Sequence, residues 1–175
     1  MSMPNIDIKK VGLDEIGQLQ EIGRKTFEES FSAGNTEENM RKYLDESFSP
    51  EKLTRELTDP GSAFYFARIG EEIVGYLKLN FGASQTELKD EKALEIERIY
   101  VVKAFHGKKV GQLLYEQAMQ VARQMNVAYV WLGVWEENPR AIHFYKKNGF
   151  VEFDKHVFKL GDDEQTDIMM KLQLS

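Results

Sequence analysis

The stretch from Leu94 to Gln112, LEIERIYVVKAFHGKKVGQ, predicts a strand, then a turn rich in glycine and lysine, then the start of a helix. Its apolar residues run to Val102, and the turn occupies residues 107–111. Backbone N–H groups at the start of a helix attract anions, and Lys108 and Lys109 add positive charge. We therefore expect the turn to hold a diphosphate and the strand to present its backbone edge to the rest of the same ligand.

The composition indicates one ordinary globular domain over residues 1–175, with 42% hydrophobic and 30% charged residues. The 23 basic and 29 acidic residues give a net charge of −6, which argues against nucleic acid and is compatible with a cationic substrate. No cysteine is present, and the three histidines lack the spacing of metal ligands, so no metal is expected. No apolar signal core or membrane-spanning run is visible, so we expect a cytoplasmic protein without a membrane partner.

The remaining periodicity predicts an α+β fold. Strands are expected at 5–11, 63–69, 73–81, 94–102, 127–135, 150–160 and 165–174, and helices after Asp14, after Thr36 and at 50–57, 108–125 and 139–148. Asp14, Ser49 and Asn138 are the expected N-caps of their helices, and a Ser-Ala-Gly-Asn run at 32–35 separates the first two helices. The order β-ααα-βββ-α-β-α-ββ predicts a single mixed, mostly antiparallel sheet with helices on both faces.

Two motifs are similar to those of a known family. One is Ile99-Tyr100-Val101 followed by FHGKKVG at 105–111, and the other is NPRAIHFYKKNGF at 138–150. Together with the element order, they resemble the GNAT superfamily of acyl-CoA-dependent N-acetyltransferases across essentially the whole chain. The first resembles the family's acetyl-CoA loop, Q/R-x-x-G-x-G/A, and the second its N-x-x-A-x-x-x-Y-x-x-x-G-F helix. His106 stands where Gln or Arg is usual, and Lys109 where the first glycine is usual.

This resemblance implies acetyl-CoA as cosubstrate and coenzyme A as product. Asn138 is similar to the residue that contacts the pantetheine arm, and Lys147 is expected to add a phosphate contact, as is the charge of Lys109. The implied cofactor-binding residues are Ile99, Tyr100, Val101, His106, Gly107, Lys108, Lys109, Val110, Gly111, Gln112, Asn138, Tyr145 and Lys147.

Three further segments look closest to the bacterial PaiA-type polyamine N-acetyltransferases: EIERIY at 95–100, WLGVWE at 131–136 and GDDEQTD at 161–167. That resemblance implies spermidine or spermine as the acceptor. Two alternatives stay open, namely a GNAT acetyltransferase of protein or antibiotic amines, and a non-catalytic acyl-CoA-binding regulatory module. A homodimer is expected because dimers are common in the family that the chain resembles and because the final pair of strands is expected to be exposed.

Acetyl transfer to an amine requires a base. The amine arrives protonated with a pKa near 10, so its neutralisation at pH 7 costs about 4 kcal/mol. Glu97 is the first candidate for the base and Glu95 the second, because strand alternation predicts that both share a face with Ile99 and Val101. Many family members place a base on the following strand, where this chain has Gly133.

The reaction also requires an oxyanion donor and an acid. The backbone N–H of Val101 is the candidate donor. Tyr145 matches the family's general acid, since a phenol of pKa about 10 can protonate a thiolate of pKa about 8.5. Each side chain has a structural alternative: Tyr145 as a core aromatic residue, and Glu97 as a carboxylate paired with Arg98 or a lysine.

Overall fold

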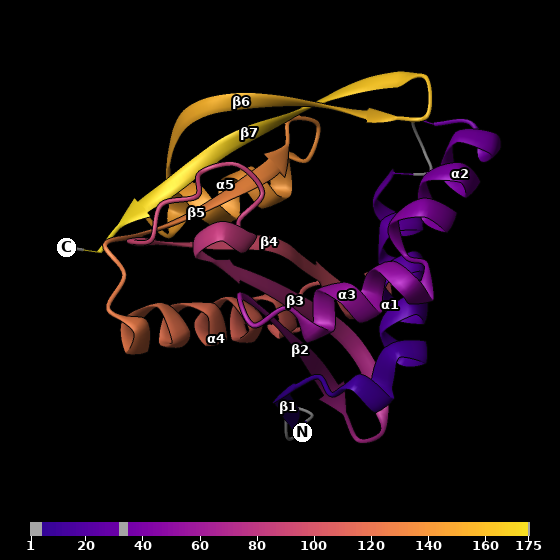
Figure 1. Cartoon of the computed structure of the whole chain (residues 1–175), viewed down its shortest axis with the longest axis horizontal. Helices are drawn as coiled ribbons and strands as arrows, with labels where there is room; N and C mark the ends of the chain where they lie inside the picture. The colour runs from indigo at the N-terminus through magenta and orange to yellow at the C-terminus, as the bar shows by residue number, and fades with distance from the viewer. Residues whose placement is uncertain (1–4, 32–34, 175) are drawn as a thin grey trace.

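A seven-stranded sheet with the order β1-β2-β3-β4-β5-β7-β6 forms the centre of the computed structural model, which describes residues 5–31 and 35–174 (Figure 1). The strands are β1 (Ile6–Lys10), β2 (Ser62–Ile69), β3 (Glu72–Phe81), β4 (Ala93–Val101), β5 (Tyr129–Trp135), β6 (Val151–Leu160) and β7 (Asp163–Gln173). The α-helices are α1 (Ile16–Phe31), α2 (Glu37–Ser47), α3 (Pro50–Thr58), α4 (Val110–Met125) and α5 (Pro139–Lys147). The predicted α+β class and element order are confirmed, while the expected break at 32–35 lies, apart from Asn35, outside the described residues.

Helices cover both faces of this sheet, as predicted (Figure 1). On one face, α4 and α5 pack on a core that includes Leu77, Leu94 and Leu114. On the other face, α1, α2 and α3 enclose a second core that includes Phe64 and Leu53. No helix within the described part of the chain is long and apolar enough to cross a membrane.

The only parallel strand pair in the described sheet is β4 with β5, and it is short. The pairing runs from Ala93 opposite Tyr129 to Ile96 opposite Leu132 and then stops. Beyond that point β4 continues along β3, and β5 continues along β7 to Trp135. The two strands therefore separate, and each has an unpaired edge facing the other.

A β-bulge lies where this separation begins. Lys78 of β3 is opposite Arg98 and Leu79 is opposite Ile96, so Glu97 is an extra residue in β4. A bulge bends its strand and increases the local twist. The extra residue therefore accounts for β4 leaving its parallel partner directly after Ile96.

The bulge also corrects a prediction. Simple alternation placed Glu95 and Glu97 on the same face as Ile99 and Val101, and this was wrong. Ile99 and Val101 pack against the core beneath α4, whereas Glu95 and Glu97 both accept hydrogen bonds from Asn80. The extra residue reverses the alternation, so that the carboxylates lie on the face of α1 and α3.

Two of the three expected helix caps are present. The side chain of Ser49 accepts from the amide of Lys52, and that of Asn138 accepts from Ala141. Asp14 is not an N-cap, because a short 3₁₀ turn at Leu13–Glu15 precedes α1 and begins after Gly12. The prediction was wrong because a single 3₁₀ turn moves the start of the structured segment without changing the apolar period.

Gly75 allows α4 to approach the sheet, and its replacement by alanine should destabilise the fold. A Cβ at this position would lie 2.8 Å from the carbonyl oxygen of Tyr100 and 3.2 Å from Leu114. We expect Gly75→Ala to lower the free energy of unfolding by about 1–3 kcal/mol, measured by urea denaturation. Gly17→Ala is the matched control: nothing lies within 4 Å of its Cβ position in α1. It should raise stability by up to about 1 kcal/mol, and equal losses in both variants would contradict the steric argument.

Candidate active site between the separated strands

A cavity of about 390 Å³ lies between the separated ends of β4 and β5. This volume falls within the range of roughly 300–1,000 Å³ typical of small-molecule sites. Residues 97–100 of β4 and 133–135 of β5 line it, together with Asn138 and Tyr145 from α5. The opposite wall comes from α1, α2 and the β6–β7 hairpin, which reaches across to α2 (Figure 1).

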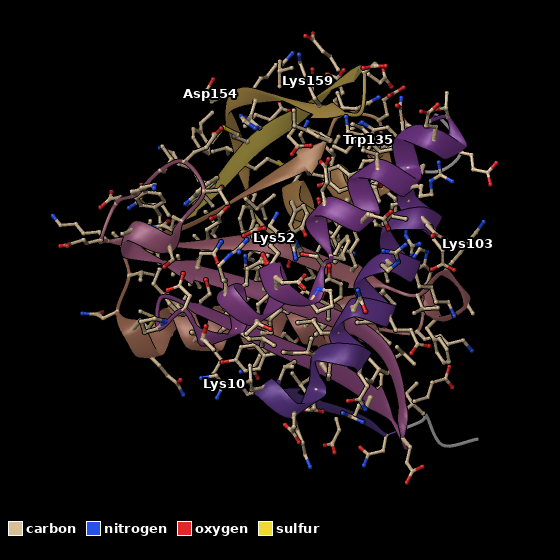
Figure 2. All side chains as sticks on the ribbon, turned by 45° about the vertical axis from the view of Figure 1, so that its right-hand side comes forward. Lys10, Lys52, Lys103, Trp135, Asp154 and Lys159 are labelled. Atoms are coloured by element: carbon tan, nitrogen blue, oxygen red, sulfur yellow. The ribbon has the colours of Figure 1, made fainter. Side chains whose placement is uncertain are left out.

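Trp135 connects the two sides of the cavity. It ends β5 beside the N-terminal helices, as its label in Figure 2 shows. Its ring lies 4.7 Å from that of Phe31 in α1, and its Nε1 donates to Gln165 Oε1 of β7 at 2.8 Å. Phe31 in turn meets Phe158 of β6 edge-on at 6.3 Å. The aromatic contacts thus hold the helices and the hairpin against the end of β5.

The start of α4 has the open amides expected of an anion site. The first bond into the helix runs from Leu113 N to Lys109 O at 3.1 Å, so the amides of Val110, Gly111 and Gln112 precede it. The N-cap makes no side-chain capping bond. In a 16-residue helix these groups carry the positive end of the dipole. The turn therefore has the geometry that a diphosphate requires.

Lys109 has a left-handed backbone conformation, which glycine adopts without steric cost. Its φ and ψ are 68° and 9°, in the left-handed region, and Gly107 also has a positive φ of 80°. A left-handed conformation costs roughly 1–2 kcal/mol for a residue with a Cβ. His106 contributes to the same turn, because its Nε2 lies 2.8 Å from the carbonyl oxygen of Val101.

The edge of β4 offers a backbone donor toward the gap. Val102 donates its N–H to Val74 O of β3 at 2.9 Å. Successive amides of a strand point to opposite sides, so the N–H of Val101 faces away from β3 and toward the separated β5. This orientation is the one required of the predicted oxyanion donor.

Tyr145 is buried and yet lines the cavity. Its side chain is 5% exposed, and its ring meets those of Phe144 and Phe150 at 5.4 and 5.5 Å. Burial raises the pKa of its phenol well above the usual value, so the group stays protonated and can donate. Asn138 starts the same helix and also lines the cavity, whereas Lys147 is exposed at the far end of α5 and is not among the lining residues.

Glu97 lines the cavity and is held there by cations. Its carboxylate accepts from Lys78 Nζ at 2.7 Å and Asn80 Nδ2 at 2.8 Å, and it lies 3.3 Å from Arg98 Nη2. Burial alone would raise the pKa of Glu97, but Arg98 and Lys78 lower it to about 2. Such a carboxylate is a weak proton acceptor. Glu95, the second candidate, is bound by Asn80 and Thr86, and burial raises its pKa above the usual value.

Asp167 of β7 is a lining residue that sequence reasoning did not select. A Cβ on Gly133 would lie only 3.3 Å from Asp167 Oδ2, so this carboxylate sits over the glycine. Burial raises the pKa of Asp167 to about 6, while His156 lowers it and Glu87 raises it. The sequence gives little signal for this residue, because β7 (DEQTDIMMKLQ) begins with several polar and acidic residues and only the pairing of β7 with β5 distinguishes Asp167.

The chain belongs to the acetyltransferase (GNAT) family, whose family model matches residues 20–150. An uncharacterized N-acetyltransferase from Lactobacillus delbrueckii subsp. lactis is 40% identical over 172 residues, covering 98% of this chain and 99% of that protein. The protein is therefore an N-acetyltransferase, and acetyl-CoA is its acyl donor.

A further relative and a solved structure are similar along nearly the whole chain. The spermidine N(1)-acetyltransferase of Thermoplasma acidophilum is 25% identical over 171 residues, covering 95% of this chain and 96% of that protein. The crystal structure of the PaiA N-acetyltransferase from Thermoplasma acidophilum in complex with coenzyme A matches with a TM-score of 0.79 at 22% identity. That match covers 97% of this chain and 99% of the other.

The ion pairs of Glu97 should contribute to stability in a pH-dependent way. Its pKa falls from 4.5 in the unfolded chain to about 2 in the folded protein, which corresponds to roughly 3 kcal/mol. This stabilisation is complete above pH 4.5 and is lost as pH falls toward 2. We expect Glu97→Gln to lower the free energy of unfolding by about 3 kcal/mol at pH 7 and by less at pH 3, measured by urea denaturation. A difference that does not shrink with acid would contradict the ion-pair assignment.

The strain at Lys109 predicts a stabilising substitution. Glycine adopts a positive φ without a Cβ clash, so Lys109→Gly should raise the free energy of unfolding by up to about 1 kcal/mol. Lys108→Gly is the matched control, because Lys108 is not among the non-glycine residues with positive φ. It should lower stability, since glycine there only adds freedom to the unfolded chain. Thermal and urea denaturation of both variants compare them directly, and a loss in Lys109→Gly would contradict the left-handed conformation.

Proposed function

We propose that the protein transfers the acetyl group of acetyl-CoA to a primary amine of a small polyamine of the spermidine or spermine type, by direct attack of the amine. The observation that carries this proposal is the acidic character of the cavity beside Tyr145. Four carboxylate side chains line it, namely Glu87, Glu95, Glu97 and Asp167, against the basic side chains of Arg98, Lys159 and His156. The overall charge of −6 favours the approach of a polycation, and the spermidine N(1)-acetyltransferase of Thermoplasma acidophilum is a relative along nearly the whole chain.

The proposed arrangement of acetyl-CoA follows the open backbone groups. The amides of Gly107 and residues 109–112 and the charges of Lys108 and Lys109 would hold the diphosphate. The pantetheine arm would then run along the free edge of β4 past Ile99 and Asn138, and the thioester oxygen would accept from the N–H of Val101. His106 shapes this turn, while Lys147, at the far end of α5, is proposed to contact phosphate.

The departing sulfur is proposed to take its proton from Tyr145. Its phenol stays protonated at neutral pH because burial raises its pKa. Glu97 is the base predicted from the sequence, but Lys78 and Arg98 hold its carboxylate and lower its pKa, which argues against this role. A cytoplasmic location and a homodimer are also proposed. For the dimer, support comes from the edge strand β6, where Val151 and Val157 are 58% and 56% exposed.

The acceptor can be identified by a free-thiol release assay with acetyl-CoA and a panel of polyamines, aminoglycosides and peptides with free N-termini. We expect spermidine or spermine to give the highest kcat/KM. Preference for a peptide or an aminoglycoside would favour the alternative acceptors. Acetyl-CoA binding without turnover of any amine would instead favour a non-catalytic acyl-CoA-binding module.

Tyr145→Phe tests the proposed acid. We expect kcat to fall by roughly ten- to a thousandfold with little change in acetyl-CoA affinity, because the ring still packs but donates no proton. Tyr115→Phe is the matched control: Tyr115 is also buried and contacts Phe144 and Phe150, but it does not line the cavity. Unchanged kcat in Tyr145→Phe, or equal losses in both variants, would remove Tyr145 from the catalytic role.

A further inference from the structure

Within the described part of the chain, Asp167 differs from the other carboxylates of the cavity in having no hydrogen-bond or ion-pair partner. Glu97 and Glu95 are held by hydrogen bonds from several donors, and Glu87 is paired with His156. Among the described residues, Asp167 has no hydrogen bond or ion pair to its carboxylate. Partly buried carboxylates normally have partners, because desolvation of the unpaired charge is costly. We therefore expect the carboxylate of Asp167 to interact with a group of the bound substrate.

The pairing of β7 with β5 places the carboxylate of Asp167 over β5. Asp167 of β7 is opposite Trp135, and Gly133 lies two residues before Trp135 on the same strand. Diagonal neighbours on antiparallel strands share a face, and the missing side chain of Gly133 leaves the room that Asp167 occupies. Asp167 thus faces the gap between β4 and β5, in the same cavity as Tyr145.

We propose that Asp167 is the catalytic base, which takes the proton from the attacking ammonium group. The proton passes from nitrogen to the carboxylate, and the freed electron pair forms the N–C bond to the thioester carbonyl carbon. The C–S bond breaks, its electron pair stays on sulfur, and Tyr145 gives that sulfur a proton. The new amide loses its second proton to restore Tyr145, and Asp167 releases its proton to solvent. This inference rests on acetyl transfer to an amine and not on which amine is used.

The electrostatic surroundings suit this role better than those of Glu97. The pKa of Asp167 is about 6, whereas that of Glu97 is about 2. Asp167 is therefore the stronger base, and its pKa lies closer to that of the ammonium group, which is about 10. The charged or titratable groups facing Asp167 are His156 of β6, Glu87 of the loop before β4, Tyr43 of α2 and Tyr100 of β4. Both tyrosines have raised pKa values and are neutral near pH 7.

The pH dependence of kcat/KM tests the proposal with the amine that turns over best in the panel. The parent enzyme should lose activity as the pH falls through about 6, because Asp167 becomes protonated. Asp167→Asn should lower kcat by roughly a hundredfold or more and abolish this acidic limb, while acetyl-CoA affinity is retained. Asp167→Glu should restore part of kcat together with the limb. A limb that persists in Asp167→Asn, or an unchanged kcat, would overturn the assignment.

Neighbouring variants separate Asp167 from the other titratable groups. His156→Gln removes a side chain that lowers the pKa of Asp167, so the limb should move to higher pH, and Glu87→Gln should move it to lower pH. Glu97→Gln should keep the limb. Disappearance of the limb in His156→Gln or Glu97→Gln would assign it to that residue and overturn the proposal.

Gly133→Ala provides a test that leaves every charge in place. The new methyl group would lie 3.3 Å from Asp167 Oδ2 and displace the carboxylate by a few tenths of an ångström. We expect a lower kcat at unchanged acetyl-CoA affinity, with the acidic limb retained. This variant also carries the test if Asp167→Asn does not fold. Full activity in Gly133→Ala would contradict a role for the position of Asp167.

Absence of turnover by the parent enzyme with polyamines affects only the proposed acceptor.

Discussion

The extra residue in β4 at Glu97 is the constraint on which the cavity depends. It ends the parallel pairing with β5 after Ile96, so that two strand edges in the middle of the sheet remain unpaired. The bulge is fixed by buried charges: Lys78 and Arg98 both reach Glu56 and Glu97 at 2.7–3.3 Å. Removal of one partner from such a cluster leaves a buried cation without its counter-charge, which is strongly unfavourable. The cluster thus resists closure of the gap.

The separated strands give the two ends of the site different chemistry. Toward α4 the chain offers backbone amides and lysines, and it keeps a left-handed backbone at Lys109 where a glycine would be less strained. Toward α1, α2 and the β6–β7 hairpin it offers aromatic rings and carboxylates. Tyr145 lies between these two groups of side chains because α5 follows directly from β5. An anionic donor would therefore meet amides and lysines at the start of α4, and a cationic acceptor would meet the carboxylates of the cavity.

The features that could be predicted from the sequence are those set by short spacings. The turn before α4, the capping Asn138 and the tyrosine seven residues after it all belong to continuous segments, so their residue types suffice. The bulge depends on the register of β4 against β3, which simple alternation within β4 does not contain. For this reason the predicted face of Glu97 was wrong. Asp167 and Gly133 come from different strands, and only the pairing of β5 with β7 brings them together.

The carboxylates of the cavity show that residue type and location do not by themselves assign a role. Glu97 has a lowered pKa because two cations outweigh its burial, whereas Asp167 has a raised pKa because burial prevails. Glu97 therefore stays ionised at neutral pH, and its ion pairs stabilise the bulge. Asp167 can change its protonation state near neutral pH, which is the property required for proton transfer to be reversible within one turnover. The role of each carboxylate in this site thus follows from the groups that contact it. Its distance along the chain from the acetyl-CoA motif does not determine that role.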